Sequence, residues 1–171
     1  NFNHPVKEIM WVVHNSIADS EDITRSNADA TLNKQGSIAQ KNDYFNYMSG
    51  NNSTVFDEYI GGQRSQEHFT TVKMTLNGQQ RFNPRNASYF RTIQPLNCGH
   101  KVPSKHIYMY SFALTPEHHQ PSGTCNFSRI DTAHLMFGRA NSDGQHKIRL
   151  YAVNYNILRI MSGMGGVAYS N

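Results

Sequence analysis

The segment 107–131 constrains the fold of this 171-residue chain more than any other part of the sequence. In its first half, Tyr108, Tyr110 and Phe112 alternate with Met109 and Ser111. Side chains that repeat with a period of two point to opposite faces of a β-strand, so this run predicts a strand with two distinct faces. A second β-rich run follows a polar Pro-Ser-Gly stretch. The segment therefore predicts a strand, a corner and another strand.

The predicted corner consists of His119, Gln120, Pro121, Ser122 and Gly123. The ring of Pro121 restricts its backbone, whereas Gly123 accepts backbone angles that other residues resist. We predict that the corner fixes the crossing between the two strands, and that its role is structural rather than one of recognition.

Other strand patterns are spread along the chain, and we predict further strands over residues 6–13, 69–76, 129–137, 147–160 and 167–169. Asn77 and Gly78 accept positive φ, so a tight turn is expected after the strand that ends at Leu76. Residues 140–144 are typical of a hairpin-type connection. The glycines of Gly163-Met164-Gly165-Gly166 are expected to let the backbone turn closely before the last strand.

One short helix is predicted between Asn83 and Gln94. Asn83 can cap a helix, Pro84 suits the first helical position, and Pro95 is expected to end the helix. Between these limits the aromatic and aliphatic residues at 89, 90 and 93 fall on one helical face.

A polar region at about 15–66 separates the first strand from the rest. It is rich in Asn, Ser, Asp, Gly and Gln, with a short apolar run near residues 44–48 that predicts a small strand. Loops of this length in compact domains are usually functional, so we predict an exposed loop insertion that forms a surface protrusion. Strands, one helix and long loops together predict an all-β protein built as an antiparallel sandwich or barrel.

Composition limits the partners of the chain. Its length suits one domain or a piece of one, and Asn1 leads directly into a strand pattern, so the sequence is expected to be part of something longer. The net charge is only +4 and the Lys and Arg residues are scattered, so direct contact with nucleic acid is not expected. No run approaches the roughly 20 apolar residues of a transmembrane segment. A bridge between Cys98 and Cys125 is not expected.

Candidate chemistry in the sequence is weak. His118 and His119 lie beside Glu117, with His100 and His106 upstream, and suggest a metal site. However, adjacent histidines in a strand or turn point to opposite sides, which argues against it. Ser122 lacks the Gly-x-Ser-x-Gly context of a hydrolase nucleophile, and the glycines near 165 lack the lysine of a phosphate loop. We therefore assign no catalytic, cofactor-binding or metal residue and expect neither an enzyme nor a cofactor.

Four Asn-x-Ser/Thr sequons are candidate glycosylation sites: Asn51, Asn52, Asn86 and Asn126. The first two lie in the polar insertion, where a glycan would fit.

Several motifs together resemble one family. They are Phe2-Asn3-His4-Pro5-Val6-Lys7-Glu8 with Trp11, Leu76-Asn77-Gly78 with Arg81-Phe82, Tyr89-Phe90 with Gln94-Pro95, and the segments 108–114, 119–131 and 151–171. This set resembles the major capsid proteins of nucleocytoplasmic large DNA viruses, in the phycodnavirus, iridovirus and mimivirus-like branch. The resemblance covers nearly the whole chain outside 15–66, although residues 96–100 do not follow the family's pattern.

The resemblance implies a fold and an assembly. Residues 1–171 would form the second, C-terminal jelly roll of a double jelly roll, an antiparallel sandwich that lacks its first strand here, with the first jelly roll upstream. The family's capsid protein forms a homotrimer, a pseudo-hexagonal capsomer that tiles the icosahedral shell of a double-stranded DNA virus. The expected partners are neighbouring capsomers and minor capsid proteins, through which an internal membrane would be contacted. The expected location is the virion, with assembly in the host cytoplasm.

Two other functions stay open at this stage. A jelly roll that displays the 15–66 loop could be a glycan- or receptor-binding module, and a cupin-like metalloenzyme is the enzyme alternative. We also expect that residues 1–171 alone do not fold as a stable monomer, because a missing strand leaves a sheet edge and a core face uncovered.

Overall fold

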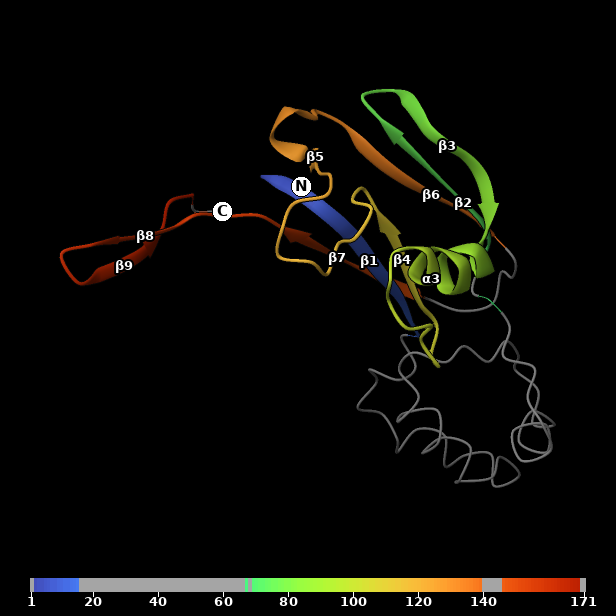
Figure 1. Cartoon of the computed structure of the whole chain (residues 1–171). Helices are drawn as coiled ribbons and strands as arrows, with labels where there is room; N and C mark the ends of the chain where they lie inside the picture. The colour runs from blue at the N-terminus through green and yellow to red at the C-terminus, as the bar shows by residue number, and fades with distance from the viewer. Residues whose placement is uncertain (1, 16–66, 68, 140–145, 170–171) are drawn as a thin grey trace, which may run out of the picture.

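The computed structural model describes residues 2–15, 67, 69–139 and 146–169 (Figure 1). The polar insertion, its short predicted strand and the sequons Asn51 and Asn52 lie outside these described residues. The described part contains strands in three sheets, one short helical segment at 87–97 and one 3-10 turn. The all-β prediction is therefore confirmed.

The first sheet is built around one central strand, β1 (Pro5–Asn15). Its antiparallel partners are β4 (Ile107–Ser111), β5 (Cys125–Asn126) and β7 (His146–Asn154). Ile9 pairs with both β4 and β7, and Val6 pairs with both β5 and β7, so β4 and β5 share the edge of β1 that lies opposite β7. Both edges of β1 are thereby occupied.

The second sheet has the order β3-β2-β6, and all its pairs are antiparallel. Its strands are β2 (Phe69–Leu76), β3 (Gln79–Asn86) and β6 (Ala133–Arg139). Asn77 (φ +49°) and Gly78 (φ +79°) form the predicted tight turn between β2 and β3. Positive φ at both positions suits the twist of the hairpin strands.

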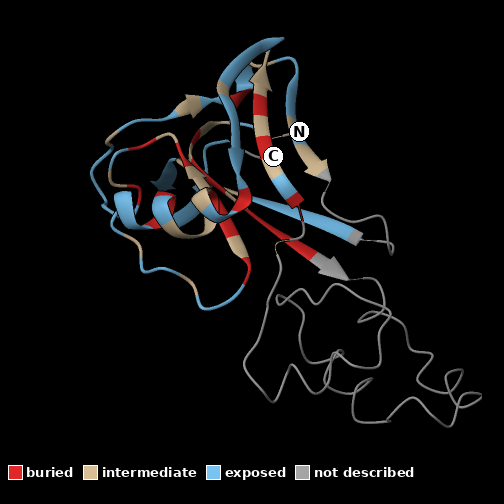
Figure 2. Ribbon diagram, turned by 90° about the vertical axis from the view of Figure 1, so that its right-hand side faces the viewer, coloured by how far each residue is buried: buried red, intermediate tan, exposed pale blue. Residues whose placement is uncertain are grey.

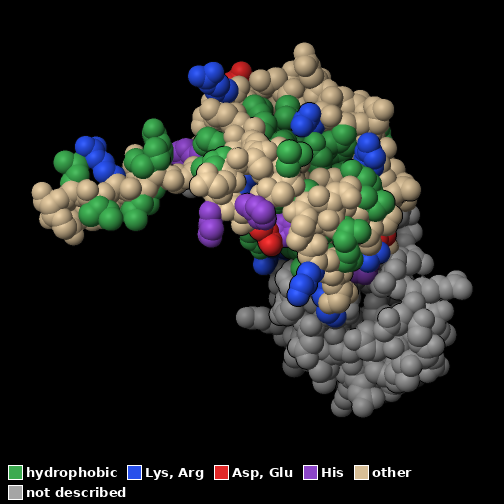
Figure 3. Space-filling view, viewed as in Figure 1, with side chains coloured by type: hydrophobic (Ala, Val, Ile, Leu, Met, Phe, Trp, Pro, Cys, Tyr) green, Lys and Arg blue, Asp and Glu red, His purple; other side chains and the backbone are tan. Residues whose placement is uncertain are grey.

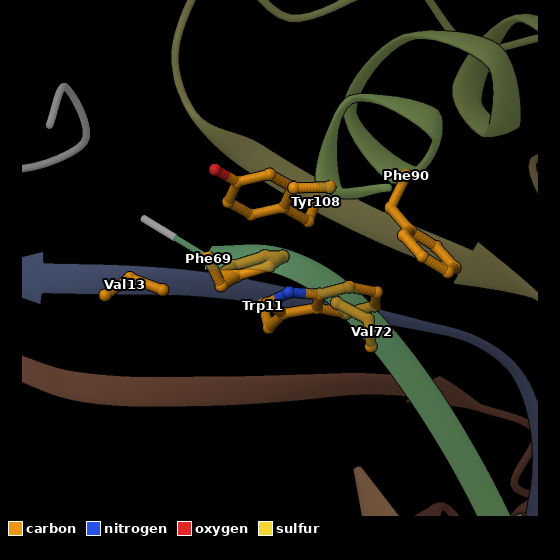
Figure 4. Packing of buried hydrophobic residues seen from close by; sticks show 7 residues of the cluster. Trp11, Val13, Phe69, Val72, Phe90 and Tyr108 are labelled. Atoms are coloured by element: carbon orange, nitrogen blue, oxygen red, sulfur yellow. The ribbon is translucent and has the colours of Figure 1, made fainter. Parts of the chain in front are cut away.

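The core lies between the two sheets and is centred on Trp11, whose side chain is 0% exposed. Its ring lies 6.0 Å from that of Tyr108 in β4 and is nearly parallel to it (Figure 4). The Trp11 ring also lies 6.4 Å from that of Phe137 in the opposite sheet. Phe90 packs on it from the helical segment at 5.4 Å. Buried residues follow the facing strands and the inner side of the helix, while the connecting loops are mostly exposed (Figure 2).

The prediction for the helix was wrong at both ends. Asn83 and Pro84 lie in β3, where both face Lys73 of β2, so they form a β-bulge on an edge strand. A proline is tolerated at such a place because the missing N–H interrupts no continuous ladder.

The helical segment covers residues 87–97 and continues past Pro95. It contains a π-helix, η3 (Tyr89–Ile93), followed by α3 (Gln94–Asn97). The amide of Gln94 donates to the carbonyl of Tyr89, five residues earlier. This wider turn precedes Pro95, which lies in the first turn of α3 and therefore does not break a regular α-helical ladder.

Boundaries near the C-terminal end also differ from the prediction. The run 129–137 begins as a 3-10 turn, η4 (Phe127–Arg129), and becomes strand only in β6. The run 147–160 is divided between β7 and β8 (Leu158–Met161). The last strand, β9, is Met164–Val167 rather than 167–169, so Gly165 and Gly166 lie within it and only Gly163 lies in the turn.

The hairpin predicted at 140–144 was also wrong. Those residues lie outside the described part, but the strands on either side, β6 and β7, belong to different sheets and do not pair. The connection therefore takes the chain from one sheet to the other.

We predict that Asn77→Ala lowers the free energy of unfolding of the intact polypeptide by about 1–2 kcal/mol. The Asn77 side-chain oxygen accepts hydrogen bonds from the amides of Asp131 (2.9 Å) and Thr132 (3.1 Å), which ties the hairpin turn to the start of β6. Urea unfolding measures the change, and Asn77→Asp is the matched control because it keeps an acceptor and tolerates positive φ. An unchanged midpoint for Asn77→Ala would contradict this role.

Candidate assembly surfaces

Residues 112–124 form a loop that leaves one edge of β1 after β4 and returns to the same edge at β5. We call this loop the excursion. β4 ends with Ser111 opposite Glu8, and β5 begins with Cys125 opposite Val6 on the same edge of β1. The predicted corner therefore does not carry the chain across to a different strand position, which corrects the expected crossing. The physical reason is that β1 offers one continuous edge, on which the chain pairs, leaves and pairs again.

Short contacts close the neck of this excursion. A Cβ atom at Gly123 (φ +138°) would lie 2.8 Å from the carbonyl oxygen of Phe112, at the other end of the loop. Ser122 is held against the outgoing chain, because its hydroxyl accepts from the amide of Thr115 (2.9 Å) and its carbonyl accepts from the amide of Leu114 (3.3 Å). The remaining predicted corner residues, His119, Gln120 and Pro121, are exposed at the far side of the loop.

A histidine ties the excursion to the sheet. His100 places Nε2 2.9 Å from a carboxylate oxygen of the buried Glu8 in β1, and Nδ1 2.8 Å from a carboxylate oxygen of Glu117 in the excursion. Each ring nitrogen therefore lies within hydrogen-bonding distance of a different carboxylate, so one imidazole bridges both acidic side chains. The arrangement links three segments that are distant in sequence.

A second polar cluster lies at the other end of β4. Glu67 accepts from Tyr108 Oη at 2.6 Å and pairs with the guanidinium of Arg91 in η3 at 2.7 Å. These charge-assisted contacts hold the helical segment against the end of the first sheet.

The structure separates the histidines that suggested a metal site. His118 and His119 are exposed on the excursion, His100 is engaged with the two carboxylates, and His106 is buried. Within the described ranges, no group of three or more His, Cys, Asp or Glu residues gathers where it could hold a metal ion. In the same part of the chain, no helix is long and apolar enough to cross a bilayer.

Both cysteines are free thiols, Cys98 buried and Cys125 half-buried. Burial raises the pKa of the Cys125 thiol, and the nearby Arg81 guanidinium opposes that shift. Burial likewise raises the pKa of Tyr110, again against Arg81. A thiol with a raised pKa is a poor nucleophile, so Cys125 contributes to packing rather than to chemistry.

Two sequons can be placed. Asn86 is exposed at the end of β3. Asn126 is exposed in β5, and its side-chain oxygen accepts from the amide of Ser128 at 3.1 Å, so this side chain caps η4.

The apolar core is open on the side of β7. A cavity of about 390 Å³ lies between the sheets, and its apolar walls include Phe2, Ile9, Met74, Leu76, Phe127 and Leu150. Leu150 pairs with Trp11 across the strands and so belongs to the core face, yet it is 38% exposed. Its neighbour on the same face, Ile148, is also exposed. A core face that remains open to water indicates a surface normally covered by further polypeptide.

A two-stranded hairpin, β8 and β9, projects from the body (Figure 1). Apolar side chains lie along it and face solvent in the described structure (Figure 3). The strand pattern at 147–160 did not predict this hairpin, because residues 158–160 continue the apolar run that forms β7. The expected close turn is present at Ser162 and Gly163, both with positive φ, but it joins β8 to β9 instead of leading to a strand at 167–169.

These features define a class. The class is that of two-sheet antiparallel β-sandwiches, here with an open apolar edge and a projecting apolar hairpin that leave apolar surface for contacts with other polypeptide. Residues 1–166 match the family described as large eukaryotic DNA virus major capsid protein, and the chain belongs to that family.

Relatives in the family come from several viruses. The chain is 57% identical over 122 residues to the major capsid protein of Phaeocystis pouchetii virus, covering 69% of this chain and 23% of that protein. It is 36% identical over 193 aligned residues to the major capsid protein of Paramecium bursaria Chlorella virus 1, covering all of this chain and 42% of that protein. The chain thus spans less than half the length of these relatives.

A solved structure confirms the predicted jelly-roll fold. The PBCV-1 virus capsid, described as a quasi-atomic model, matches over the whole of this chain and 45% of its own, with a TM-score of 0.64 and 33% identity.

We predict that Gly123→Ala destabilises the intact protein by about 2–4 kcal/mol, because the new methyl group meets the Phe112 carbonyl and the backbone keeps a positive φ. Gly99→Ala is the matched control, since Gly99 also has positive φ (+82°) but has no atom within 4 Å of an added Cβ. The control should lose only about 1–2 kcal/mol. Equal losses by thermal unfolding would show that the close approach to Phe112 is unimportant.

Proposed function

We propose that this chain is the second jelly roll of a double-jelly-roll major capsid protein, and that the whole protein builds the icosahedral shell of a large double-stranded DNA virus. The observation that carries the proposal is the match of the whole chain to 45% of a capsid chain at 33% identity. A relative more than twice as long leaves room for a first jelly roll. The role is structural, and the proposal assigns no catalytic activity or cofactor to the chain.

The number of strands in each sheet of the described part supports the presence of additional jelly-roll strands upstream in the whole protein. Each large sheet has three strand lines, β3, β2 and β6 in one and β4 with β5, β1 and β7 in the other. A jelly roll has about eight strands in two sheets, so the described residues fall two lines short, one in each sheet. The expected upstream strand would supply one of them, and we propose that a second upstream strand supplies the other. We place the two absent strands upstream, on the edges of β6 and β7, where they would cover the open core face.

We further propose that the protein forms a homotrimer, a pseudo-hexagonal capsomer that contacts neighbouring capsomers and minor capsid proteins in the virion. Assembly would take place in the host cytoplasm, and minor proteins would mediate any contact with an internal membrane. Buried apolar area drives such assembly, and closed symmetry repeats each contact in every subunit.

For the segment 119–123 we propose a structural role, in which Ser122 and Gly123 close the excursion at its neck. The support is the hydrogen bonding of Ser122 and the close approach of Gly123 to Phe112. Among the sequons we propose Asn86 as the better glycan acceptor of the two described ones, because the side chain of Asn126 already caps η4.

Light scattering of the intact capsid protein, coupled to size-exclusion chromatography, tests the assembly. We expect the mass of three subunits and pseudo-hexagonal particles in electron micrographs. A stable monomer that binds sugars on a glycan array would contradict the shell role and favour a receptor-binding module.

The isolated piece 1–171 gives a separate prediction. At micromolar concentration it should show no cooperative thermal transition as a monomer, because the core face near Leu150 stays in contact with water. A longer piece that adds the two proposed upstream strands is the matched control and should unfold cooperatively. A cooperative transition of monomeric 1–171 would contradict the expectation.

A further inference from the structure

The β8–β9 hairpin has one continuous apolar face. Leu158 pairs with Val167 and Ile160 with Gly165, and cross-strand partners share a face of the hairpin. The three side chains on this face are largely exposed, Leu158 by 67%, Val167 by 60% and Ile160 by 68%. The opposite face carries the pair Arg159 and Gly166, and so includes a charge, together with the exposed pair Met161 and Met164 next to the hairpin turn. We call the face with Leu158, Ile160, Gly165 and Val167 the arm face.

The glycines of β9 have no explanation within the described chain. An added Cβ at Gly165 or Gly166 would meet no atom within 4 Å, and neither residue has a positive φ. Glycine in a strand costs conformational entropy and forfeits a packing side chain, and it often marks a bulge, a tight bend or a close approach of another backbone. Only Gly165 shares its face with the exposed Leu158, Ile160 and Val167, so we apply the close-approach interpretation to Gly165 alone. On the arm face, Gly165 leaves a flat notch between the large side chains.

The hairpin also lacks the support that two strands need. Isolated two-stranded sheets are marginally stable in water and usually require a third strand or a packed neighbour. Within the described residues, the strands β8 and β9 pair only with each other. Its apolar side chains would otherwise remain a solvent-exposed patch.

The base of the hairpin lies beside the N-terminal residues of the chain. The ring of Tyr169 lies 5.7 Å from that of His4, the Asn154 side chain donates to the carbonyl of Asn3 at 3.2 Å, and the amide of Tyr155 donates to the carbonyl of Pro5 at 2.9 Å. Polypeptide that precedes residue 2 therefore joins the body next to the hairpin. The related capsid chain is more than twice as long, so it supplies enough additional polypeptide to cover the hairpin.

We propose that the arm face is an intramolecular docking surface, and that its occupant is the upstream part of the same polypeptide, seated with a backbone segment over Gly165. The inference rests on the proposed function, because that function places a first jelly roll upstream. In this arrangement the hairpin clamps the two halves of each subunit together instead of linking neighbouring subunits.

Two valine substitutions in the full-length capsid protein test the notch. Gly165→Val puts a side chain on the arm face and should lower the melting temperature by about 2 °C or more. Gly166→Val is the matched control on the opposite face and should leave the melting temperature unchanged or raise it, because valine favours strands. If both variants are as stable as the parent, or both are destabilised alike, docking through the arm face is wrong.

A photo-cross-link identifies the occupant. With p-benzoylphenylalanine incorporated at Leu158, illumination of the full-length protein should give a cross-link to an upstream peptide within one subunit mass on a denaturing gel, whereas incorporation at Arg159 should give little. A product of two subunit masses would assign the surface to a second copy, and absence of any product from Leu158 would leave the arm face uncovered; either result overturns the proposal.

Light scattering of the same sample before illumination keeps the two proposals separate. An intrachain link in a protein that is not a trimer would retain the docking surface and reject the trimeric capsomer. A trimer with only interchain links would do the reverse.

Discussion

The burial of Trp11 between the two sheets is the contact on which the rest of the structure depends. Its ring touches Tyr108 of its own sheet, Phe137 of the facing sheet and Phe90 of the helical segment, so one side chain joins three layers. Truncating a fully buried tryptophan typically costs about 3–5 kcal/mol, a large share of the stability of a domain. Because Trp11 lies on β1, the strand paired on both edges, its position also sets the register of the first sheet.

The open side of the sandwich follows from the same arrangement. Trp11 is covered from three directions, but the core face beside it, at Leu150 and Ile148, has no covering strand in the described chain. A subunit of a shell can tolerate such surface only if other polypeptide buries it. The open edge and the apolar hairpin therefore share one physical feature, which is apolar surface that the described chain does not bury.

The sequence predictions succeeded where the interactions involved are local in sequence, and they failed where the structure depends on distant segments. The strand at 69–76 and the turn at Asn77 and Gly78 were correct because alternation and positive φ are local properties. The pair Asn83 and Pro84 misled because a cap followed by proline suits a helix start and a bulge on an edge strand equally well. Pairing with β2 decided between them, and no residue within the segment reports that pairing.

The sequence by itself determined the strand-rich class, the strands that became β1, β2 and β4 and, through its motifs, the resemblance to the family of large DNA virus capsid proteins. Tertiary structure alone decided that β4 and β5 occupy one edge of β1, that β6 and β7 lie in different sheets, and that β8 and β9 leave the body as a hairpin. It also decided why position 123 is glycine, since the carbonyl that excludes a side chain there belongs to Phe112. Alternation and turn chemistry act between neighbours in sequence, whereas edge pairing and close backbone approach depend on which distant segments bury the same apolar surface.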